Sequence, residues 1–104
     1  MIIDEIIEAI QSNHINVTRH ARQEANNDSL TWDEILFSTS HGEIIKDYSD
    51  DKPYPSCLIY GNTLMDKPVH SVWAYYFACK IAILITVYRP NPNLWINWKE
   101  RRKP

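Results

Sequence analysis

The N-terminal part of the chain places apolar side chains at intervals of three and four residues, the period of an α-helix with one buried face. Acidic side chains fill the positions between them, so an amphipathic first helix is predicted that ends at about Asn13. Its apolar residues are Ile2, Ile3, Ile6, Ile7 and Ile10.

Two further helices are predicted before the middle of the chain. Thr18 is suited to cap the second helix, which is expected to run to about Asn26. After a turn, Thr31 and Glu34 have the spacing of a capping box, in which each side chain bonds the other residue's backbone N–H. This pattern starts the third helix, and Gly42 follows its end.

The second half of the chain alternates with period two, which is typical of strands. Four such runs are separated by turn residues: Glu43–Tyr48, Ser56–Tyr60, Val69–Phe77 and Lys80–Tyr88. Along the last run, one face is expected to hold Ile81, Ile83, Ile85 and Val87. Helices followed by consecutive antiparallel strands predict an α+β fold, with the N-terminal helices packed on a four-stranded, mainly antiparallel sheet. A single domain over residues 1–104 is expected.

The segment Val69–Tyr88 is twenty residues long and mostly apolar, a length that could cross a bilayer. Lys80 lies near its middle, and β-branched and aromatic residues dominate it, so a two-strand hairpin is the better interpretation. The N-terminus lacks the basic stretch of a signal peptide. A cytoplasmic protein without a membrane anchor is therefore expected.

The net charge of −2 conceals an uneven distribution along the chain. Residues 1–51 hold 11 acidic and 3 basic side chains, a balance of −8, whereas residues 52–104 hold 2 acidic and 8 basic ones, a balance of +6. A polyanion such as RNA would therefore meet the second half more readily than the first.

The two cysteines, Cys57 and Cys79, both lie in apolar stretches. They are interpreted as small buried hydrophobic residues, because no CxxC motif or other ligand spacing accompanies them. No metal site is predicted.

Three residues near the start of the second predicted helix suit the cleavage of RNA without a metal. That reaction needs a base for the ribose 2′-hydroxyl, an acid for the leaving 5′-oxygen and cations for the phosphate. His20 fits the first two tasks, since an imidazole titrates near neutral pH. Arg19 and Arg22 flank it at a helix N-terminus, which favours a bound phosphate. The alternative is that His20 bonds locally and both arginines lie in solvent.

A second group of candidates stands on the last two predicted strands. His70 begins the third strand, and Tyr88 and Arg89 end the fourth. Tyrosine can donate a proton or stack on a base, and arginine can hold a phosphate through two N–H groups. The length of the hairpin loop, to within one residue, decides which of positions 86 to 88 lies opposite His70. It therefore also decides whether His70 and Tyr88 share a face. The alternative is that His70 has its hydrogen bonds satisfied in or beside the core, that Tyr88 is a core residue and that Arg89 is exposed.

Trp95 and Trp98 follow the last predicted strand and stand directly before a basic run that contains Lys99, Arg101 and Arg102. Aromatic and basic side chains in this mixture stack on bases and attract phosphates, and Trp95 and Arg101 are assigned here to RNA binding. The alternative is a tryptophan lid over the core followed by a solvated tail, and for Trp98 this alternative is favoured.

Five short patterns occur in order along residues 15–102. They are Thr18-x-His20-Ala21-x-x-Glu24, Gly42-Glu43-Ile44-Ile45 with Tyr48, Tyr54-Pro55-Ser56-Cys57-Leu58-Ile59-Tyr60-Gly61, Pro68-Val69-His70, and Thr86-Val87-Tyr88-x-Pro90 with Trp95. In their order and spacing they resemble domain-of-unknown-function family 4258. That family in turn resembles the RelE-like toxin fold, in which N-terminal helices lie over a small antiparallel sheet.

The resemblance implies a small endoribonuclease toxin that cleaves free or ribosome-bound RNA by transphosphorylation. It also implies a neutralising antitoxin protein, which is of the zinc-finger type in relatives with a similar helix-first layout. His20, His70 and Tyr88 are carried over as catalytic residues, with the nearby arginines as phosphate ligands, and no metal or organic cofactor is implied. The rival hypothesis is a non-catalytic interaction module, whose acidic helices bind a basic partner or whose sheet edge accepts a strand.

Overall fold

The computed structural model describes residues 1 and 3–103, so Ile2, which is part of the predicted first helix, lies outside the described residues. Within the described residues, three helices occur in the first half of the chain: α1 (Ile3–Gln11), α2 (Arg19–Asn27) and α3 (Trp32–Ser40). The predicted caps are confirmed. The Thr18 hydroxyl accepts the Ala21 N–H at 3.1 Å, and Thr31 and Glu34 bond reciprocally at 2.9 and 3.1 Å.

The sheet has five strands in the order β1-β5-β4-β3-β2. They are β1 (Ile15–Val17), β2 (Glu43–Tyr48), β3 (Ser56–Asn62), β4 (Pro68–Tyr76) and β5 (Ile81–Tyr88). The four predicted antiparallel strands are present as β2 to β5. The prediction of a four-stranded sheet is wrong by one strand, because β1 pairs in parallel with β5. A strand of three residues is too short to show an alternating pattern.

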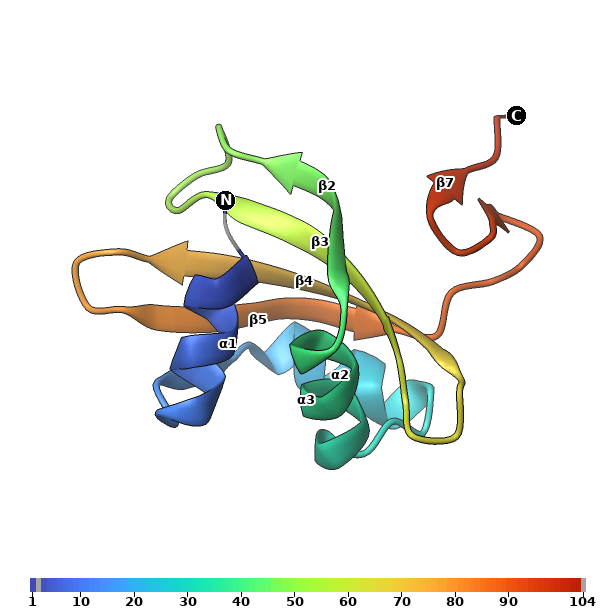
Figure 1. Ribbon diagram of the computed structural model, residues 1–104, viewed down its shortest axis with the longest axis horizontal. Coiled ribbons are helices and arrows are strands. Elements are labelled where there is room, and N and C mark those ends of the chain that lie inside the picture. The colour runs from blue at the N-terminus through green and yellow to red at the C-terminus, as the bar shows by residue number, and fades with distance from the viewer. Residues whose placement is uncertain (2, 104) are drawn as a thin grey trace.

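The three helices cover one face of this sheet, as Figure 1 shows. The core between them includes Ile6 of α1, Ala21 of α2 and Ile35 of α3, which pack with Trp73 and Leu84 of the sheet. Full burial of each large apolar side chain stabilises the fold by roughly 1.5–3 kcal/mol. We call the opposite side, which carries His70 and Tyr88, the open face.

The C-terminal segment crosses from the end of β5 to the open face. It contains a small hairpin of β6 (Trp95–Ile96) and β7 (Glu100–Arg101), which is separate from the main sheet. In Figure 1 this segment lies beyond the sheet, on the side away from α1 and α3. The β6–β7 hairpin therefore covers part of the open face.

Strand β5 contains one extra residue, Ile85. Trp73 of β4 pairs with Leu84, but the preceding β4 residue pairs with Thr86. Such a bulge inverts the alternation of side chains beyond it. Val87 therefore joins the core on the helix side and is fully buried, so the prediction that it shares a face with residues 81, 83 and 85 is wrong.

The long apolar segment of the sequence forms the β4–β5 hairpin, as predicted. Among the described residues, no helix has the length and apolar character needed to cross a membrane. Cys57 is buried in β3, as expected, but the prediction that Cys79 is buried is wrong. The turn between β4 and β5 carries Cys79 out of the strand and leaves it exposed.

Candidate active site on the open face of the sheet

His70 stands in the middle of a row of three aromatic rings that crosses three strands. It pairs with Tyr60 of β3 on one side and with Tyr88 of β5 on the other. Residues directly opposite each other in antiparallel strands have side chains on the same face, about 5 Å apart. His70 is nevertheless 0% exposed, because the C-terminal segment with Trp95 and Trp98 covers it.

Both ring nitrogens of His70 have hydrogen-bond partners. Nε2 lies 2.6 Å from the backbone carbonyl oxygen of Trp98, which can only accept, so Nε2 carries the proton. Nδ1 of the neutral ring is then an acceptor, and the Tyr88 hydroxyl donates to it at 3.1 Å. The phenolic proton of Tyr88 therefore points at the histidine, and the lone pairs of that oxygen take no part in this bond.

The surroundings keep both members of this pair uncharged at neutral pH. Burial lowers the pKa of His70 below its usual 6.5, although the hydrogen bond to the Trp98 carbonyl opposes the decrease. Burial raises the pKa of Tyr88, and the nearby charge of Arg101 partly opposes that increase. A neutral imidazole bonded to a protonated phenol is the state in which Nδ1 can take up a proton from Tyr88.

Trp95 and Arg101 lie next to this pair. The Trp95 ring meets the His70 ring edge to face, with centroids 4.5 Å apart and planes at 88°. The guanidinium carbon of Arg101 lies 5.8 Å from the centroid of the Trp95 ring, close enough for a cation–π contact. Pairing of β6 with β7 places these two residues opposite each other. Among the described residues, no carboxylate forms an ion pair with Arg101.

A cavity of about 230 Å³ adjoins the β6–β7 hairpin, and its lining includes Trp95, Arg101 and two lysines, Lys46 and Lys99. Lys99 is neutralised by Glu43, whose carboxylate lies 2.7 Å from Nζ. Lys46 and Arg101 therefore supply the net positive charge of this cavity against the single carboxylate of Glu100 in its lining. Phosphates are the groups that such a positive hollow beside an aromatic ring can attract.

Residues 17–89 match the family described as Domain of unknown function (DUF4258). The chain belongs to this family. The DUF4258 match includes His70 and Tyr88 but ends before Trp95, Trp98 and Arg101. The His70–Tyr88 pair is thus part of the DUF4258 region, while the segment that covers it is outside the match. Neither the search of curated proteins nor that of solved structures found a match.

His20 and Arg19 of this DUF4258 chain are not part of the row on the open face. Both are exposed in the first turn of α2, whose Ala21 packs into the core on the helix side of the sheet. Among the described residues, no hydrogen bond or ring contact joins His20 to His70. The assignment of His20 and Arg19 to the same site as His70 therefore gains no support from their placement.

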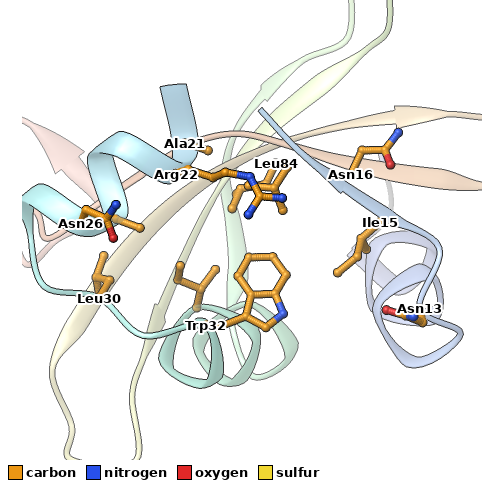
Figure 2. Close-up of a pocket in the computed structure, with 12 residues that line it drawn as sticks. Asn13, Ile15, Asn16, Ala21, Arg22, Asn26, Leu30, Trp32 and Leu84 are labelled. Carbon is orange, nitrogen blue, oxygen red and sulfur yellow. The ribbon is translucent and has the colours of Figure 1, made fainter. Parts of the chain in front are cut away.

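Arg22 also lies on the helix side. It lines a cavity together with Leu84, whose side chain belongs to the core beneath the helices (Figure 2). The sheet separates this cavity from His70. Arg22 is therefore not in place to hold a phosphate beside the His70–Tyr88 pair.

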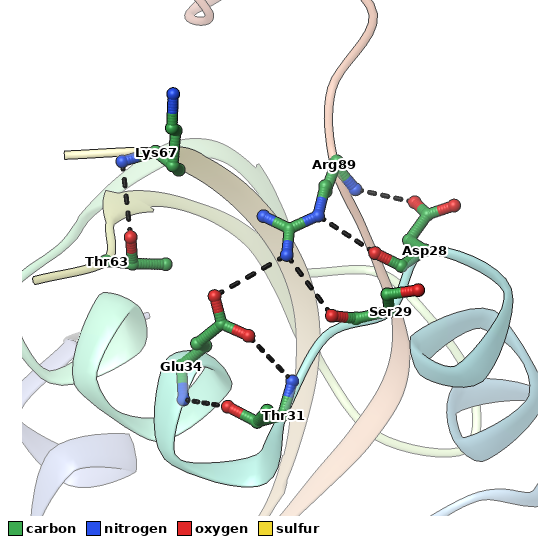
Figure 3. A network of polar contacts seen from close by, with 7 residues as sticks. All are labelled: Asp28, Ser29, Thr31, Glu34, Thr63, Lys67 and Arg89. Atoms are coloured by element: carbon green, nitrogen blue, oxygen red, sulfur yellow. Dashed lines mark hydrogen bonds and ion pairs between the residues drawn. The ribbon is translucent and has the colours of Figure 1, made fainter. Parts of the chain in front are cut away.

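Arg89 follows Tyr88 directly, but it bonds to the loop between α2 and α3 (Figure 3). Its backbone N–H donates to the Asp28 carboxylate at 2.7 Å, and its Nε donates to the Asp28 carbonyl at 2.9 Å. The terminal nitrogen reaches the Ser29 carbonyl at 3.3 Å and the Glu34 carboxylate at 3.5 Å. These partners occupy the guanidinium with the protein itself, which gives Arg89 a structural role.

Two members of the site are not evident from the sequence pattern. Tyr60 joins the row only because β3 and β4 pair with Tyr60 opposite His70, and the turn between those strands has no short hairpin signal that fixes the register. The Trp98 carbonyl belongs to the backbone of a turn, so no side-chain pattern reveals it. No cluster of three or more metal-ligating side chains occurs among the residues that the structure describes.

Proposed function

We propose that this DUF4258 protein is a RelE-like toxin, a metal-independent endoribonuclease of the cytoplasm that an antitoxin protein neutralises. The observation that carries the proposal is the 3.1 Å contact between Nδ1 of His70 and the Tyr88 hydroxyl, on a face that also holds Trp95 and Arg101. Helices on one face of a mainly antiparallel sheet are compatible with the RelE-like architecture.

In the proposed reaction, Tyr88 and His70 act together as the base. The 2′-hydroxyl of the ribose transfers its proton to the Tyr88 oxygen, while the phenolic proton moves to Nδ1 of His70. The 2′-oxygen attacks phosphorus and the bond to the 5′-oxygen breaks, which leaves a 2′,3′-cyclic phosphate. The 5′-oxygen takes up the proton that the imidazolium returns through Tyr88, so the net change moves one proton from the 2′-oxygen to the 5′-oxygen.

The surrounding side chains would bind the substrate. Arg101 would pair with the phosphate as negative charge gathers on it, and the exposed part of Trp95 would stack on a base. The Trp98 carbonyl keeps Nε2 of His70 protonated and so fixes Nδ1 as the acceptor. The proposal gives no catalytic step to His20, Arg22 or Arg89, because the structure places them elsewhere.

The decisive experiment incubates purified protein with a mixed RNA in EDTA, with and without translating ribosomes, and resolves the product ends. Fragments that end in 2′,3′-cyclic phosphate are expected, and Tyr88→Phe should cut more slowly by about a hundredfold or more. Tyr60→Phe is the matched control, since the Tyr60 hydroxyl bonds to Asn62 and not to His70. Circular dichroism verifies that both variants fold. Intact RNA under all conditions would reject the proposal.

A non-catalytic interaction module is the second candidate, and the position of β2 favours it. This strand forms one edge of the sheet and is mostly exposed, so one side of its backbone is available to a strand from a partner. The module predicts tight binding of a protein with no nucleolytic activity. Salt separates the two candidates, since RNA binding through Lys and Arg weakens steeply with rising ionic strength.

A further inference from the structure

A second cavity, of about 670 Å³, lies on the helix side of the sheet (Figure 2). Its walls come from the chain just after α1, from β1, from α2 and from the start of α3. This volume falls in the range of about 300–1,000 Å³ that is typical of small-molecule sites. The sheet separates the cavity from His70, so an occupant would not touch the candidate active site.

The walls of this cavity combine apolar side chains with one large flat ring. Ile15, Leu30 and Leu84 contribute apolar surface. Trp32, the first residue of α3, is 39% exposed, and Figure 2 shows its indole extending into the space between the helices. Trp32 thus offers a surface on which another planar ring can stack.

Charge and hydrogen-bonding groups gather at the rim. The Arg22 guanidinium extends from α2 over the same space as the Trp32 ring (Figure 2). None of the ion pairs among the described residues includes Arg22, and no carboxylate is part of the described lining. The side-chain amides of Asn13 and Asn26 add donors and acceptors. The cavity therefore has one positive charge with no internal counterion.

We propose that this cavity binds a small ligand that carries a flat ring and one anionic group. The ring stacks on Trp32 against the apolar wall, and the phosphate or carboxylate accepts two N–H bonds from Arg22. The asparagine amides bond polar atoms at the edge of the ring. Arg22, which the sequence analysis assigns to RNA cleavage, would then bind a different ligand, on the face of the sheet opposite to His70.

Titration of the purified ¹⁵N-labelled protein by NMR tests the proposal. The probes are adenosine 5′-monophosphate and indole-3-acetate, which join a ring to a phosphate or a carboxylate. Adenosine has the ring without the anion, and inorganic phosphate has the anion without the ring. Saturable shifts are expected at the Trp32 indole N–H and the side-chain amides of Asn13 and Asn26 with at least one of the first two probes. Their relative affinities distinguish a phosphate ligand from a carboxylate ligand.

Two variants connect the binding to the cavity. Arg22→Gln should weaken the binding of the ring-bearing anion about tenfold and leave the weaker binding of its neutral analogue unchanged. Arg19→Gln is the matched control, since Arg19 lies on the same helix but does not line the cavity. The Arg19→Gln variant should bind the ring-bearing anion with the affinity of the unmodified protein. Absence of saturable shifts with both anionic probes would overturn the proposal, as would equal affinities for Arg22→Gln and Arg19→Gln. Neither result bears on cleavage at Tyr88.

Discussion

His70 lies opposite Tyr88 because β5 contains one residue more than a regular hairpin would place there. The register nearest the β4–β5 turn, if continued, would set His70 opposite Val87 and would turn Tyr88 towards the helix side of the sheet. The bulge at Ile85 moves the pairing by one residue, so that the Tyr88 hydroxyl reaches Nδ1 of His70 at 3.1 Å. A local irregularity of the strand thus creates the pair on which the proposed chemistry depends.

Stability should fall in mild acid because of His70. Burial holds its folded-state pKa below the usual 6.5, so the unfolded chain binds the proton first as the pH decreases. The contribution of neutral His70 is fully present above about pH 6.5 and is lost as the pH falls towards the folded-state pKa. Urea unfolding at pH 7.5, 6.5 and 5.5 should show a decreasing midpoint.

The His70→Gln variant should lose much of this pH dependence, while His20→Gln should keep it, because His20 is exposed in the folded protein. If the two variants and the unmodified protein show the same dependence on pH, His70 is not the group responsible.

Arg89 is expected to matter for stability more than for RNA binding. Arg89→Ala removes the bonds from the side chain to the Asp28 and Ser29 carbonyls and to the Glu34 carboxylate, and should lower the free energy of unfolding by about 1–2 kcal/mol. The Arg101 side chain contacts none of these groups, so Arg101→Ala should change the free energy of unfolding by less than about 0.5 kcal/mol. Urea unfolding provides both values.

The same two variants distinguish the structural role of Arg89 from its predicted role as a phosphate ligand. With cleavage measured at a temperature where both are folded, Arg101→Ala should reduce the rate and Arg89→Ala should not. If Arg89→Ala is folded and stable but no longer cleaves RNA, Arg89 binds the phosphate as the sequence predicts.

The helices and antiparallel strands could be predicted from the sequence because each depends on local signals. Thr18, Thr31 and Glu34 cap helices through bonds within a few residues, and alternation marks the strands wherever one face is buried. The strand Ile15–Val17 could not be predicted, because it is supported by its parallel pairing with β5, which no local pattern reveals.

The candidate site could be predicted only in part, because its residues meet through long-range register. His70, Tyr88, Trp95 and Arg101 were suitable residue types, and the structure brings them together. His20 was grouped with them on chemical grounds, but the order of helices and strands in the sequence does not say which face of the sheet a helix covers. Spacing along a chain therefore identifies candidates better than it identifies neighbours.

The contact between α3 and β3 at Gly61 should not tolerate a side chain. A Cβ at this position would lie 1.8 Å from the carbonyl oxygen of Ser38, which is backbone and cannot rotate away. Gly61→Ala should therefore destabilise the fold by about 3 kcal/mol, as overpacked cores do. Asn62→Ala, one residue further along β3, should cost about 1 kcal/mol through its lost bond to Tyr60. Equal unfolding midpoints for the two variants would argue against this close approach.

The two cysteines should differ in reactivity towards a thiol reagent. Cys57 is 0% exposed, and burial raises its pKa to about 12, so almost no thiolate forms at pH 8. Cys79 is exposed in the β4–β5 turn and should react. Ellman's reagent should therefore modify one thiol per folded chain and two in urea. Cys79→Ser should abolish the reaction of the folded protein and leave one reactive thiol in urea, whereas rapid modification of folded Cys79→Ser would show that Cys57 is accessible.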